Sequence, residues 1–183
     1  MRSTGEVLGL EENFSLAFYK SQVGSGTAKT AGSELPHAPA AWENKKVLIS
    51  LSNKESQKDQ VLMIGKTLKD LGFTLVGTQG TADFYNANGI KCEVVNKIGG
   101  GRPDVVDLIM NKEVCLVINT PKAKRNYAED RKTIRKMCLK YKVSYITTLA
   151  GAVAAVKGIE AVMNGNGGEG GVKSLQEYHS LIK

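Results

Sequence analysis

From residue 46 onward, short apolar runs rich in β-branched residues alternate with stretches of helical periodicity. The runs have the length of strands, and they lie at 46–51, 73–77, 90–95, 114–119 and 143–148. Helical patterns separate or follow them, at 61–71, 81–89, 104–111, 128–141, 149–162 and 174–183. Strands that alternate with helices in this way predict an α/β fold, with a mainly parallel sheet and helices on both faces.

The first 45 residues do not share this pattern. Residues 11–23 have the spacing of a short amphipathic helix, with Phe14, Ala17 and Phe18 on one apolar stripe. Residues 24–45 are rich in small residues, contain two prolines and show no periodicity, which is typical of a linker. We therefore expect a helical segment over 1–23, a linker over 24–45 and the α/β domain over 46–183.

Composition narrows the class of protein. With 183 residues, 42% of them hydrophobic and 23% charged, the chain has the composition of a globular domain. It contains no run of 18 apolar residues, so we expect no transmembrane helix. The N-terminus lacks the apolar region of a secretory signal, and the three cysteines form no CxxC pair. These features predict an intracellular, cytoplasmic protein with reduced thiols.

Polar residues follow four of the predicted strands, at the edge where parallel α/β sheets bind their ligands. They are hydroxyls, amides and lysines, with almost no carboxylate among them: Ser50, Ser52, Lys58, Thr78, Gln79, Gly80, Thr81, Asn96, Lys97, Asn119, Thr120 and Lys122. Hydroxyls and N–H groups at a helix start bind phosphate, and lysines neutralise it. The set predicts an anion pocket, although the Thr-Gln-Gly-Thr stretch at 78–81 taken alone is also typical of an ordinary turn.

Residues suited to catalysis are scarce. The two histidines lie far from these strand ends, which disfavours a metal site or a Ser-His-Asp triad. The glycine-rich stretch 99–107 lacks the spacing of a nucleotide-binding loop, so we expect a loop that leads into a helix started by Pro103. Asp104 and Asp107 could form a carboxylate pair, but their place at a helix start explains them without catalysis. We expect no catalytic residue and no metal.

Positive charge is concentrated in residues 122–142, within a chain of formal net charge +7. Such a block is typical of nucleic-acid binding, of an anionic small ligand or of a solvated helix face. Few aromatic residues interleave it, which disfavours stacking on single-stranded nucleic acid. Nucleic-acid binding remains an alternative hypothesis here.

Several longer strings resemble a known family. They are TQGTA, VVNKIGGGRPDVVDLI, VINT, RKTIRKMCLKYKVSYITTLAG and SLQEYHSLIK. These strings resemble the C-terminal allosteric domain of carbamoyl-phosphate synthase large chains, which has the methylglyoxal-synthase-like fold. The N-terminal stretch resembles the end of the second synthetase half, so we expect a piece of a far longer protein.

The resemblance implies a three-layer α/β/α fold with a five-stranded parallel sheet, and a pocket that binds UMP or IMP as an effector. Phosphate would meet Lys58, Thr78, Gly80 and Thr81. The ribose and base would meet Lys97, Asn119, Thr120 and Ile134, and Thr147 would lie at an amino-acid effector site. No cofactor is implied for this chain, whereas the parent ligase would use ATP with Mg or Mn and a glutaminase small chain, in pyrimidine and arginine biosynthesis.

Two departures from that family stand out. Gln79 takes the place of a histidine found in many bacterial relatives, and Pro121 takes the place of a threonine. A methylglyoxal synthase-type lyase acting on dihydroxyacetone phosphate is the alternative within the same fold. That chemistry requires a carboxylate that acts as a base, and a histidine, in the pocket. Asp104 is the nearest candidate for the carboxylate, and no histidine is present.

Overall fold

The computed structural model describes residues 7–24, 46–52, 55–120, 128–164 and 174–180. Five strands form one sheet in the order β3-β2-β1-β4-β5, and every neighbouring pair is parallel. The strands are β1 (Lys46–Ser50), β2 (Thr74–Thr78), β3 (Cys92–Val95), β4 (Val114–Asn119) and β5 (Ser144–Ile146). The predicted five-stranded parallel sheet is confirmed.

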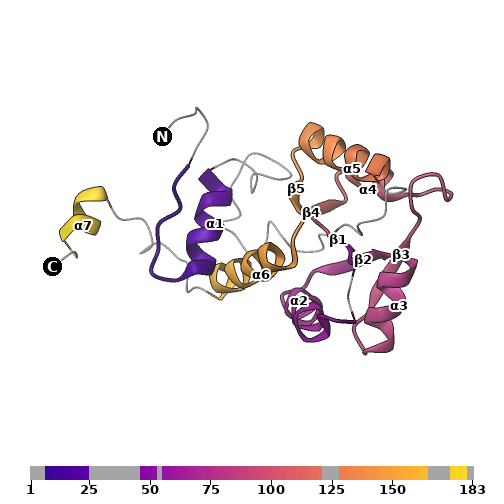
Figure 1. Cartoon of the computed structure of the whole chain (residues 1–183), viewed down its shortest axis with the longest axis horizontal. Coiled ribbons are helices and arrows are strands. Elements are labelled where there is room, and N and C mark those ends of the chain that lie inside the picture. Colours follow the sequence, from indigo (N-terminus) through magenta and orange to yellow (C-terminus); the bar gives the residue numbers. More distant parts are fainter. Residues whose placement is uncertain (1–6, 25–45, 53–54, 121–127, 165–173, 181–183) are drawn as a thin grey trace.

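Helices cover both faces of the sheet (Figure 1). One face carries α2 (Lys58–Asp70), α3 (Gln79–Ala87) and α6 (Leu149–Met163), and the other carries α4 (Val105–Met110) and α5 (Ala128–Tyr141). The sheet has a hydrophobic core on each face, and successive strand residues pack into opposite cores. Val47 and Ile49 pack toward α2 and α6, whereas Leu48 packs toward α4 and α5. Because both faces are buried at the centre of the sheet, β4 is buried at every position, whereas the edge strand β3 exposes Glu93 and Val94.

The strand order places a crevice at the carboxyl end of β1. The chain runs from β1 to β2 and β3 on one side, then returns to place β4 and β5 on the other side. The chain continues from β1 to α2 on one face of the sheet and from β4 to α5 on the other face, and such a divergence leaves space for a ligand at that edge. The candidate residues after the strands lie along this edge.

The N-terminal helix, α1 (Phe14–Gly24), packs against α6 (Figure 1). The approach is close at Gly158, where a Cβ atom would come 2.7 Å from the carbonyl oxygen of Ser15. The helix begins later than the predicted residue 11 because Asn13 caps it, accepting a hydrogen bond from the amide of Ser15 at 2.8 Å. Phe14, expected on the apolar stripe, is 73% exposed.

Other boundaries differ from the prediction by one to three residues. α3 begins at Gln79 and not at residue 81, so Thr78 occupies the N-cap position. α4 begins at Val105 after the N-cap Asp104, so Pro103 precedes the helix and does not start it. The last helix, α7, spans Leu175–Ser180, and the predicted linker lies outside the described residues beyond Gly24. Among the helices of the described ranges, none has the length and apolarity needed to span a bilayer.

Candidate functional site

A cavity of about 170 Å³ opens at the carboxyl edge of the sheet, on the side of α4 and α5. The ends of β2, β1 and β4 form its floor, and the first turns of α3 and α5 form parts of its rim. Its lining consists of Leu48, Ser50, Leu51, Ser52, Thr78, Gly80, Thr81, Lys97, Ile98, Val105, Val117, Asn119, Thr120, Asp130, Arg131 and Ile134.

The start of α3 forms a cradle of hydroxyls and backbone amides. Thr78, at the N-cap, has an extended backbone, and its side chain makes no capping bond to the helix. Thr81 is 2% exposed, and its hydroxyl oxygen accepts a hydrogen bond from the amide of Leu51 at 3.3 Å. That bond orients the hydroxyl and uses only its acceptor capacity. Because first-turn amides lack partners within their helix, this cradle has the character of an anion site.

Two hydrogen bonds join the loops after β1 and β4, next to the last paired residues of these strands, Ser50 and Asn119. The amide of Thr120 donates to the carbonyl of Ser50 at 3.0 Å, and the amide of Ser52 donates to the hydroxyl of Thr120 at 3.0 Å. These bonds hold three hydroxyl-bearing residues at the floor of the cavity. They place polar donors and acceptors in a fixed arrangement next to the cradle of α3.

Asn119 connects the floor to β5. It is 7% exposed, and its side-chain amide donates to the hydroxyl of Tyr145 at 3.3 Å. Burial raises the pKa of Tyr145, and the Asn119 hydrogen bond and the charges of Arg135 and Arg131 act in the opposite direction. The phenol is therefore protonated at neutral pH and keeps a donor for a further partner.

Apolar side chains form another part of the lining, an apolar wall. It is contributed by the sheet, by the loop after β3 and by α4 and α5, through Leu48, Val117, Ile98, Val105 and Ile134. A cavity that pairs one apolar wall with a few directed polar groups suits a flat organic ligand with a charged end.

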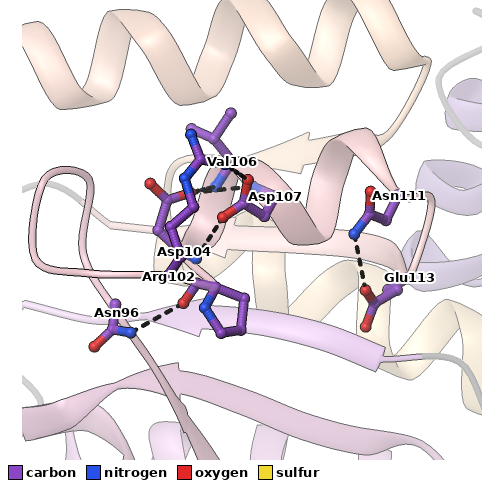
Figure 2. Close-up of polar contacts among 8 residues, drawn as sticks. Asn96, Arg102, Asp104, Val106, Asp107, Asn111 and Glu113 are labelled. Atoms are coloured by element: carbon purple, nitrogen blue, oxygen red, sulfur yellow. Dashed lines mark hydrogen bonds and ion pairs between the residues drawn. The ribbon is translucent and has the colours of Figure 1, made fainter.

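The loop that carries Lys97 is closed at its base (Figure 2). Asn96 forms a bridge with Asp104, its side-chain amide donates to the carbonyl of Pro103 at 3.1 Å, and its own carbonyl accepts from the amide of Val105 at 3.1 Å. Lys97 follows directly and lines the cavity. The closed base therefore fixes the point from which the lysine side chain extends.

Asp104 and Asp107 form a reciprocal cap at the start of α4 (Figure 2). Asp104 Oδ1 accepts from the amides of Val106 at 2.8 Å and Asp107 at 3.1 Å, and Asp107 Oδ2 accepts from the amide of Asp104 at 2.9 Å. Asp107 also pairs with Arg102. The helix start thus accounts for both carboxylates. Within the described ranges, no three His, Cys, Asp or Glu side chains gather closely enough to hold a metal ion.

The cavity brings together most of the predicted site residues, namely Thr78, Gly80, Thr81, Lys97, Asn119, Thr120 and Ile134. Lys58 begins α2 and Thr147 follows β5, and neither lines the cavity. Gln79 is exposed and outside the cavity, where its side-chain amide donates to Asp83 at 2.7 Å.

Sequence reasoning missed Asp130 and Arg131 as lining residues. Arg131 belongs to the basic block 122–142, within which the sequence alone does not distinguish a residue that lines a cavity from one that is exposed. Residues 121–127, including Pro121 and Lys122, lie outside the described residues.

Comparison with known proteins agrees with this geometry. Residues 60–147 match the family model of the MGS-like domain. The chain belongs to the MGS-like domain family. Its architecture is a five-stranded parallel sheet with a cavity at the carboxyl edge.

Within that family the chain is similar to carbamoyl phosphate synthase large chains, as the sequence motifs predict. It is 42% identical over 179 residues to that of Archaeoglobus fulgidus, covering 98% of this chain and 15% of the relative. It is 38% identical over 183 residues to that of Xanthomonas axonopodis pv. citri, covering 100% and 15%. The "large chain, C-terminal section" of Aquifex aeolicus is 36% identical over 183 residues, covering 99% and 31%. The chain therefore spans only about 15% of the length of the full large chains.

Proposed function

We propose that the chain is a regulatory module that binds a nucleoside monophosphate of the UMP or IMP type. The observation that carries the proposal is the cavity itself. It combines an anion cradle at the start of α3, the lysine Lys97 and an apolar wall. These are the features that a phosphate attached to a flat base requires.

The ligand would lie across the strand ends. Its phosphate would meet Thr78, Gly80 and Thr81 at β2, with Lys97 beside them after β3. Neighbouring strands lie roughly 4.8 Å apart, so β4, two strands away from β2, is about 10 Å from the phosphate. The ribose would then meet Asn119 and Thr120, and the base would pack against the apolar wall that includes Ile134.

The module would act within the large chain of a glutamine-dependent carbamoyl phosphate synthase in the cytoplasm, serving pyrimidine and arginine biosynthesis. Its partners would be the remaining domains of that chain and a glutaminase small chain. A nucleotide that binds one state of the assembly more tightly shifts the population toward that state. The ATP and Mg or Mn of the ligase would belong to the other domains. Lys58 would assist at the phosphate, and Thr147 would face an amino-acid effector.

Calorimetric titration of the full 183-residue chain with UMP and IMP tests this proposal. We expect saturable binding, and we expect Thr78→Ala to weaken it about tenfold because a hydrogen bond to a charged group is lost. Thr133→Ala, at an exposed site on α5 outside the cavity, is the matched control and should change the affinity less than twofold.

Two outcomes would overturn the proposal. One is salt-sensitive binding of a short oligonucleotide with no binding of mononucleotides, which indicates a nucleic-acid-binding domain. The other is conversion of dihydroxyacetone phosphate, which indicates a lyase.

A further inference from the structure

The first turn of α5 carries a cation at the end of the helix where cations are disfavoured. α5 begins at Ala128, and Glu129 and Asp130 are favourably placed with respect to the helix dipole, whereas Arg131 is not. Arg131 is half-buried and lines the cavity.

One side of α5 faces the cavity. Asp130, Arg131 and Ile134 all line it, and their spacing of three and four residues places them on neighbouring positions of the helix surface. Lys132 is directed elsewhere: its side chain is 74% exposed and pairs with Glu129 at 3.0 Å. Two adjacent basic residues therefore have different surroundings, and of the two only Arg131 lines the cavity.

Arg131 lines the part of the cavity formed by α5, and α5 packs against β5 at the other side of the sheet from β2. The charge of Arg131 acts on Tyr145 of β5, whose hydroxyl accepts from Asn119 at the end of β4. Thr78 ends β2, two strands from β4 and three from β5. At roughly 4.8 Å per strand, the two ends of the site are about 10 to 14 Å apart. A monophosphate bound at the cradle would extend its base, and not its phosphate, toward Arg131.

Building on the proposed function, we propose that Arg131 is a specificity-determining residue that selects oxo bases over amino bases. The arginine side chain presents five N–H donors and no acceptor. Uracil and hypoxanthine offer an exocyclic oxygen as an acceptor, whereas cytosine and adenine carry an amino donor at the corresponding position. The guanidinium would donate to the oxygen of an oxo base and would oppose the amino group of the others.

The test measures affinity of the full chain for UMP, CMP, IMP, AMP and ribose 5-phosphate, which lacks a base. We expect the wild-type protein to prefer UMP over CMP, and IMP over AMP, by about 10- to 100-fold. Arg131→Ala should reduce both preferences to less than about threefold and leave ribose 5-phosphate binding unchanged. Arg131→Lys, which keeps the charge without the planar fork, should retain only part of the preference. Lys132→Ala should change none of these affinities.

The outcomes separate this inference from the proposed function. If the mononucleotides bind but Arg131→Ala keeps the oxo preference, the inference is wrong and the proposed function stands. The inference is also wrong if Arg131→Ala weakens ribose 5-phosphate as much as UMP, because the arginine then serves the phosphate. If neither the nucleotides nor ribose 5-phosphate bind the wild-type chain, both proposals fail.

Discussion

The backbone amide of Leu51 donates a hydrogen bond to the hydroxyl of Thr81 across 3.3 Å, joining the end of β1 to the first turn of α3. Both residues line the cavity, and both are buried. The threonine thus joins the fold to the cavity, since it satisfies a buried amide of the fold and lines the cavity.

Replacing Thr81 with valine keeps the shape of the side chain and removes the acceptor. We expect Thr81→Val to lower the free energy of unfolding by about 1–3 kcal/mol, because the amide of Leu51 is left buried without a partner. Urea denaturation measures this change. Thr81→Ser keeps the hydroxyl and should lose less stability, so equal losses in the two variants would show that the hydrogen bond contributes little.

Asp104 is expected to act through its cap and not through its charge. Asp104→Ala should cost about 0.5–2 kcal/mol of unfolding free energy, whereas Asp104→Asn should stay close to wild type because asparagine is an equally good N-cap. Urea denaturation gives the stabilities, and calorimetry with UMP gives the affinities. A loss of ligand binding or of any turnover in Asp104→Asn would instead show that the carboxylate itself is required.

Gln79 should have little influence on nucleotide binding. Its side chain is exposed, lies outside the cavity and is bonded to Asp83. We expect Gln79→His and Gln79→Ala to change the affinity for UMP less than about twofold, because no direct contact is altered. A tenfold change in calorimetric titration would contradict the described position of this residue.

Gly65 is the point where α2 meets the ring of Tyr85. A Cβ atom at this position would lie 2.3 Å from Cε1 of that ring. Tyr85 is fully buried and is held by a hydrogen bond from its hydroxyl to the carbonyl of Val61 at 2.9 Å. Since the ring cannot easily move, we expect Gly65→Ala to cost about 1–3 kcal/mol in thermal or urea unfolding. Lys66→Ala, on the exposed side of α2, should change the free energy by less than about 0.5 kcal/mol.

The buried thiols predict a loss of stability at alkaline pH. Burial raises the pKa of Cys138 from 9.0 to about 12, and burial together with the charge of Glu93 raises the pKa of Cys92 to about 12. The folded state therefore keeps these protons while the unfolded state releases them above pH 9. The contribution of these thiols to stability should be constant below that pH and fall between about 9 and 12, by up to roughly 1.4 kcal/mol per pH unit for each thiol.

Urea denaturation in reducing buffer at pH 8 and pH 10 measures this dependence. Cys138→Ala should show a smaller fall between the two pH values than the wild-type protein, whatever its stability at pH 8. An unchanged fall would show that Cys138 does not titrate differently in the two states.

The order and type of the helices and strands could be predicted because each element carries its own signal. Buried strands are continuous apolar runs, as in β4, and helices repeat their apolar residues at helical spacing, as in α2. The predicted helix ends at Gly72 and Gly89 have the positive φ angles of +87° and +75° that favour glycine. At α1 and α4 the first helical residue lies later than predicted, by three residues and by one, because the capping bonds of Asn13 and Asp104 set it.

By itself, the sequence determined the α/β class, the succession of elements and the polar character of the strand ends, because these depend on residues close together in the chain. The tertiary structure decided which of those residues share a cavity. Ser52 and Thr120 are 68 residues apart and meet only because β1 and β4 are neighbours in the sheet. For the same reason, only the packing of α5 beside the cavity singles out Arg131 from the basic block, and the turn of α3 directs Gln79 away from it.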